Sequence, residues 1–282
     1  MHVLCRYFVL LGALTVSAVP ASAQSSLGSE RQDIRHATGD IWAIWTSPVR
    51  GTPRDVAPAI GGLSLIGAVG LRDSAIWHWM TTHPDAFPMR IIRPIREEWK
   101  LPLYEFGSGQ LLVPVSGILY TAGRLSHDVD LRDAGLGCAA GHLASLGVRD
   151  VIYETISRAR PRVTVHPGEI GFPGSDDWSW HSFLSGHVAN SMACASFVGH
   201  RFALGKGAIL PYAMSLAIGF GRMADGRHWA SDTMAGAVLG FAIGKAIAAR
   251  QLERKGRAST VGGSAASRDG PSFQVLQFSY GF

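Results

Sequence analysis

The stretch GRMADGRHWASDTMAGAVLG, residues 221–240, places ionisable side chains directly ahead of a run of small and apolar residues. The small residues favour a buried helix packed against a neighbour. Arg222, His228 and Asp232 follow the spacing R-x5-H-x3-D. If the chain is helical from His228 onward, this histidine and Asp232 lie on one face, where a carboxylate could fix the imidazole tautomer. The stretch therefore predicts either a catalytic helix start or a helix end that carries solvated charges.

The composition is that of a globular but strongly apolar chain. Its 282 residues are 47% hydrophobic and 17% charged, and they include 34 glycines. This length suffices for one large domain with a substantial core. The formal net charge of +5 suits anionic substrates or an anionic membrane surface. No basic run alternates with aromatic residues, which argues against nucleic acid as a partner.

Six apolar or mixed segments follow one another along the chain, and their lengths and Ala/Gly/Leu content favour helices. They lie at residues 56–71, 107–123, 134–153, 187–203, 207–221 and 232–249. We therefore expect an all-α fold, a single helical bundle with a six-helix core. The segments are short for membrane spans or interrupted by polar residues. A soluble or membrane-associated bundle is favoured, and an integral membrane protein is the alternative.

The two ends of the chain differ from this core. Residues 1–23 have the pattern of a cleaved signal peptide, with small residues in A-x-A register, and predict export, to a bacterial periplasm. Residues 24–55 are polar and are expected to form an extended arm ahead of a helical domain at 56–252. Residues 253–282 are expected to be a polar linker and tail that ends in one strand.

Two cysteines remain once the signal peptide is removed, Cys138 and Cys194. In an oxidising compartment they could pair, and as residues of Ala/Gly-rich helical segments they could equally be buried free thiols. The sequence leaves both alternatives open, and it leaves the oligomeric state open as well.

Two further clusters carry polar groups at expected helix ends. Ser185 stands at an N-cap position, Gly186 allows a ligand to approach the backbone, and His187 follows in the first turn, so this helix start suits an anion. Arg160 precedes Pro161 at the end of a helical segment. An arginine there either pairs with the helix dipole or clamps a phosphate.

Taken in order, the three clusters resemble the motifs of the type 2 phosphatidic acid phosphatase superfamily. This family includes lipid phosphatases, class A acid phosphatases and vanadium haloperoxidases, and its pattern is K-x6-R-P, then P-S-G-H, then S-R-x5-H-x3-D. The corresponding segments here are YETISRARP at 153–161, LSGH at 184–187 and GRMADGRHWASD at 221–232. The resemblance extends over residues 56–249.

The resemblance implies a metal-independent phosphatase that hydrolyses a phosphomonoester, or a lipid phosphate or pyrophosphate, through a phosphohistidine. By motif position, His228 would be the nucleophile, Asp232 would orient it, and His187 would be the general acid and then the general base. Phosphate binding would fall to Arg160, Arg222, Ser185 and Gly186. The family chemistry needs no metal or cofactor, and its partners would be a small-molecule or lipid phosphate and a membrane surface.

Tyr153 is the main departure from the family pattern, because it takes the place of the motif lysine. A lysine offers a cation to the phosphate, whereas a phenol can only donate a hydrogen bond. Tyr153 itself, as a donor, and Arg158, as a neighbouring cation, are the candidate substitutes. The loss of the lysine leaves open a catalytically degenerate envelope binding or scaffold protein. A vanadium haloperoxidase is a less favoured alternative, because that family also needs the lysine.

Overall fold

The computed structural model describes residues 21–47, 53–97, 105–174 and 176–266. Its helices are α1 (Ala21–Trp45), α3 (Pro53–Gly70), α4 (Asp73–Thr82), α5 (Met89–Glu97), α6 (Glu105–Ser108), α7 (Leu112–Ser126), α8 (Val129–Thr155), α9 (Gly186–Arg201), α10 (Ile209–Ala224) and α11 (Ala230–Ala266). Two short 3-10 helices, η1 (Trp178–Trp180) and η2 (Gly205–Ala208), lie in the connections.

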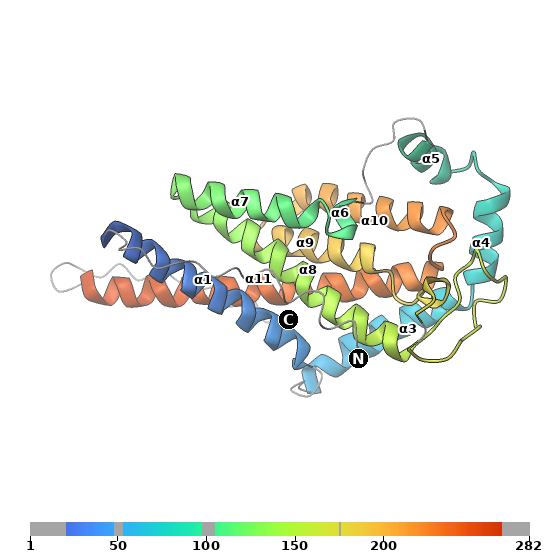
Figure 1. The fold of residues 1–282 in the computed structure, drawn as a ribbon, viewed down its shortest axis with the longest axis horizontal. Helices are drawn as coiled ribbons and strands as arrows, with labels where there is room; N and C mark the ends of the chain where they lie inside the picture. Colours follow the sequence, from blue (N-terminus) through green and yellow to red (C-terminus); the bar gives the residue numbers. More distant parts are fainter. Residues whose placement is uncertain (1–20, 48–52, 98–104, 175, 267–282) are drawn as a thin grey trace.

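The expected all-α fold is confirmed. Over the described residues the chain forms helices, and its only β-type pairing is a pair of isolated bridges at Arg158. Each of the six expected apolar segments overlaps a helix of the bundle, namely α3, α7, α8, α9, α10 and α11. The long connection between α8 and α9 lies at the same end of the bundle as α4 (Figure 1).

Helix α9 packs against α8, α10 and α11 (Figure 1). Its contact with α11 is close because Gly236, Gly240 and Gly244 recur every fourth residue on the face of α11 that meets α9. A Cβ at Gly240 would lie 2.3 Å from the backbone oxygen of Ala189, nearer than van der Waals contact allows. The small-residue run seen in the sequence therefore serves direct backbone-to-backbone packing.

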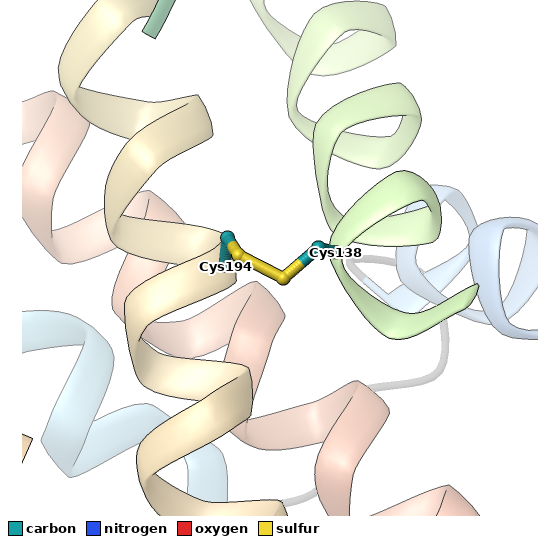
Figure 2. The surroundings of a disulfide bond; sticks show 2 residues. All are labelled: Cys138 and Cys194. Carbon is teal, nitrogen blue, oxygen red and sulfur yellow. A yellow bond between two sulfur atoms is a disulfide. The ribbon is translucent and has the colours of Figure 1, made fainter. Parts of the chain in front are cut away.

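A disulfide joins α8 to α9 beside this core (Figure 2). Cys138 and Cys194 have Cα atoms 4.5 Å apart, and Cys138 is buried against the side chains of Phe197 and Ile247. The pairing that the sequence left open is thus present in the structure.

The extended arm expected at residues 24–55 is wrong, because α1 occupies most of that range. Asp40 of α1 is almost completely buried, and it pairs with Arg250 and Arg254 of α11. Such tertiary contacts stabilise a helix in a segment whose composition does not favour one.

The linker expected from residue 253 is also partly wrong, since α11 continues to Ala266. Arg254, one of the two arginines that pair with Asp40, lies on this part of α11 and ties it to α1. The expected C-terminal strand lies outside the described residues, as do residues 1–20 of the expected signal peptide.

Among the described residues, one helical stretch, Ala230–Arg257, is long and apolar enough to cross a membrane. Of its most apolar window, 50% is buried inside the protein. The helices Val56–Gly70 and Asp73–Thr82 meet the same criterion only as a pair that is bent by 52°.

Removal of the disulfide should destabilise the bundle. Its cysteines are separated by 56 positions, and closing a loop of that size in the unfolded chain corresponds to about 4 kcal/mol. We expect Cys138→Ala/Cys194→Ala to lower the free energy of unfolding by that order, measured by urea denaturation. A reductant should lower the wild-type value similarly and leave the double variant unchanged. Equal stability of the oxidised wild type and the double variant would contradict the pairing.

Candidate active site

The three motif segments meet around one cavity of about 160 Å³. Its basic lining residues are Arg149, Arg160, Arg222, Arg227, His187 and His228. Tyr153, Trp178 and Gly186 complete the lining. Of the residues expected at the site, Ser185, Asp232 and Arg158 do not line the cavity.

His228 lies in the turn just before α11 and is almost completely buried. Its Nδ1 is 2.7 Å from the backbone oxygen of Ser182. A carbonyl oxygen can only accept, so Nδ1 carries the proton and Nε2 holds the lone pair. Burial lowers the pKa of His228 well below 6.5, and the charges of Arg222 and Arg160 lower it further. The ring is therefore neutral at pH 7, as a nucleophile must be.

Asp232 is linked to the His228 ring through Ser182. The Asp232 carboxylate accepts hydrogen bonds from Ser182 Oγ at 2.5 Å, from the Trp229 backbone N–H at 2.8 Å and from Arg158 Nη1. Ser182 thus binds the carboxylate with its hydroxyl and the histidine with its carbonyl. Asp232 and the imidazole are thus connected through one residue.

Arg158 pairs with two buried carboxylates and is not available to a phosphate in the cavity. Nη1 binds Asp232 and Ser231 Oγ, Nη2 lies 2.8 Å from Asp73 Oδ2, and Nε donates to the Pro167 carbonyl. This geometry does not support Arg158 as the substitute for the motif lysine. A guanidinium that already neutralises two carboxylates would leave both charges buried and unpaired if it moved.

Asp73 of α4 is a site residue that the sequence gave no reason to select. Its Oδ1 accepts from the Ser231 backbone N–H at 2.9 Å and its Oδ2 from Ser231 Oγ at 2.5 Å, beside the ion pair with Arg158. It therefore satisfies donors at the start of α11, where a carboxylate also meets the positive end of the helix dipole.

Arg160 and Arg222 both face the cavity, as the motifs imply. Arg160 is 4% exposed, and its Nη2 donates to the His181 carbonyl at 3.0 Å, which fixes the guanidinium. Burial lowers the pKa of Arg160 to about 10. The side chain is still charged at pH 7, so it can bind an anion.

The start of α9 supplies the second histidine. Ser185 is the N-cap residue of α9, and its side chain makes no capping hydrogen bond. Its buried Oγ has no hydrogen-bond partner among the described residues. His187 lies in the first turn, where burial, followed by the charges of Arg222 and Arg149, lowers its pKa to about 3. His187 is thus neutral at pH 7.

Tyr153 lines the cavity with its ring, while its hydroxyl is already used. The phenol donates to the Leu184 carbonyl at 3.0 Å, and the ring stacks on His181 with centroids 4.9 Å apart. Burial raises the pKa of Tyr153, so the phenol stays neutral. This geometry does not support the hydroxyl as a donor to phosphate.

Two cavity arginines were missed in the sequence, Arg149 and Arg227. Arg149 lies four residues before Tyr153, which places both on one face of α8, and this spacing could have identified it. Arg227 directly precedes His228 in the third motif. Among the described residues, no group of three or more His, Cys, Asp or Glu side chains is arranged to hold a metal ion.

Comparison with known proteins identifies the same part of the chain. Residues 135–255 match the family model described as the PAP2 superfamily. A lipid A 1-phosphatase from Porphyromonas gingivalis is 34% identical over 76 residues, which cover 25% of this chain and 16% of that relative's length. A transmembrane PAP2-type phosphatidylglycerolphosphate phosphatase from Bacillus subtilis is 21% identical with a TM-score of 0.46, over 73% of this chain and 96% of that one. Every residue that lines the cavity falls within the range that matches this family model. The resemblance inferred from the three motifs is thus confirmed.

Proposed function

We propose that this chain is a metal-independent phosphatase that works through a phosphohistidine at His228. The observation that carries the proposal is the convergence of a neutral buried histidine, a second histidine and several arginines on one cavity. Phosphoryl transfer requires positioning and stabilisation of dispersed negative charge, and these groups supply both.

In the first step, His228 Nε2 attacks phosphorus, the N–P bond forms, and the P–O bond to the leaving group breaks. Arg160 and Arg222 stabilise the charge on the non-bridging oxygens, together with the backbone N–H groups at the start of α9. His187 donates a proton to the leaving oxygen. The Nδ1–H bond to Ser182 balances the positive charge that the ring acquires.

In the second step, a water molecule attacks the phosphohistidine. His187, now neutral, accepts the proton of that water, and the N–P bond breaks to release inorganic phosphate and neutral His228. His187 is then protonated as at the start of the cycle. The same residue thus serves as acid and then base, which requires a pKa that rises when phosphate is bound.

We further propose that the leaving group is apolar, as in a lipid phosphate or pyrophosphate. Trp178 lines the cavity and is 60% exposed, and Phe172 on the same α8–α9 connection is 90% exposed. Val165 and Ile170 on this connection are also exposed. Exposed apolar side chains beside a basic cavity suit a substrate with a charged head and an apolar body.

Export to the periplasm and attachment to a membrane belong to the same proposal. The disulfide is typical of proteins in oxidising compartments. Large apolar side chains are exposed on α3 and α10, among them Ile60, Leu63, Ile209 and Leu210. Such a surface supports contact with lipid.

A degenerate binding or scaffold protein is the second candidate, favoured by Tyr153 in place of the motif lysine. It keeps the fold and the basic cavity, and it predicts anion binding without turnover.

Phosphate release in the presence of EDTA distinguishes these candidates. We expect the oxidised protein to hydrolyse both a soluble aryl phosphate and dispersed phosphatidate, with the lower KM for the lipid. His228→Ala should reduce kcat by at least about 10³-fold because it removes the nucleophile. Release that survives in His228→Ala, or that depends on added metal, would contradict the proposed mechanism, and the absence of release from any phosphate ester would favour the degenerate protein.

Phosphate binding should draw protons into the site at pH 7. Burial and nearby arginines lower the pKa of His187 to about 3, and a phosphate anion bound beside the ring raises it. Binding therefore takes up protons, and the affinity falls as pH rises. Titration calorimetry in buffers of different ionisation enthalpy measures the number of protons, with His187→Asn as the control for the titration of phosphate itself. Identical proton uptake by the two proteins would rule out His187 as the proton carrier.

A further inference from the structure

A cation lines the cavity one helical turn from the position of the motif lysine, which is occupied by Tyr153. Arg149 lies one helical turn before Tyr153 on α8, and both side chains line the cavity. The Arg149 guanidinium carbon lies over the Tyr153 ring, 5.5 Å from its centroid. Such a cation–π contact holds a guanidinium in place while its N–H groups remain able to bind an anion.

The start of α9 leaves room for this arginine. A Cβ at Gly186 would lie 2.6 Å from Arg149 Cδ and 3.4 Å from Nη1. The side chain of Arg149 therefore passes directly over Gly186, at the helix start where the backbone N–H groups suit an anion. Gly186 thus allows a cation from α8 to reach the phosphate position on α9.

The ion pair that Arg149 makes in the structure is weak enough to be replaced by contacts with a substrate. Its ion-pair partner is Asp150, whose side chain is 55% exposed. An exposed pair of this kind contributes little to stability. By contrast, Arg158 is held by two buried carboxylates. The positive charge of Arg149 also acts inside the cavity, where it helps to lower the pKa of His187.

We propose that Arg149 binds the phosphoryl group in place of the motif lysine, and that Tyr153 is the surface on which its guanidinium lies. This inference rests on the proposed function of the cavity and adds a residue to it. Tyr153 is fixed for this purpose by its hydrogen bond to the carbonyl of Leu184, the residue that replaces the proline of the second motif.

Binding of inorganic phosphate and hydrolysis of an aryl phosphate test the role of Arg149. Arg149→Ala should weaken phosphate binding and lower kcat/KM by about 10²-fold, the usual effect of losing one donor to a transition-state oxyanion. Arg35→Ala, which removes the same charge from an exposed position on α1, should leave both values unchanged. Asp150→Asn releases Arg149 from its ion-pair partner and should maintain or strengthen phosphate binding. If the ion pair had only a structural role, Arg149→Ala and Asp150→Asn would both weaken phosphate binding.

Rescue by the family residue is the decisive comparison. In the wild-type background, where Tyr153→Lys adds a cation beside Arg149, this change should not raise the phosphate affinity or kcat/KM. In the Arg149→Ala background it should raise both values at least tenfold. Values for Arg149→Ala equal to those of Arg35→Ala, or loss without rescue, would overturn the proposal. If wild-type protein binds phosphate in an Arg149-dependent manner but hydrolyses nothing, the proposed function fails and the assignment of Arg149 stands. If the wild-type protein binds no phosphate, the assignment of Arg149 is overturned.

Discussion

The backbone contact between α9 and α11 sets the geometry of the cavity. A Cβ at Gly236 of α11 would lie only 2.5 Å from the backbone oxygen of Ser185, and the Ser185 N–H donates to the Asp232 carbonyl at 3.0 Å. The starts of the two helices are therefore tied together through main-chain atoms. His187 and His228 sit at these two starts, so the packing of the bundle fixes their separation. A site built on rigid helix ends is better positioned than one carried by flexible loops.

Buried charge provides the second constraint on the site. Arg158 lies between Asp73 and Asp232, and Ser182 and Ser231 supply further hydrogen bonds to the two carboxylates. A buried group of ions is stable only when every member is paired, so these residues hold α4, the α8–α9 connection and the start of α11 in one arrangement. Arg149, which lines the cavity, has instead an exposed ion-pair partner, Asp150.

The sequence predicted six of the helices and most of the cavity, because both depend on local patterns. Small-residue runs identified α9 and α11, and the spacing of three motifs selected Arg160, His187, Arg222 and His228. The contacts that depend on distant parts of the chain could not be predicted. Asp73 and Arg158 are 85 residues apart, and neither their spacing nor their surroundings indicates an ion pair. The helix α1 depends likewise on a pairing of Asp40 with residues of α11. Arg149 could have been found from its spacing to Tyr153, had the missing lysine been sought on the same helix face.

The central claim is that His228 forms a covalent bond to phosphorus, and direct trapping of that bond tests it. An aryl phosphate has a leaving group that needs little help from an acid, so it should allow the first step even in His187→Asn, where the second step lacks its base. We propose an alkaline quench during turnover, because the N–P bond is labile in acid, followed by mass spectrometry of the peptides. The account predicts a phosphoryl group on His228, with a higher occupancy in His187→Asn than in the wild type. Turnover with a phosphoryl group on another residue, or with none on His228 in either protein, would contradict it.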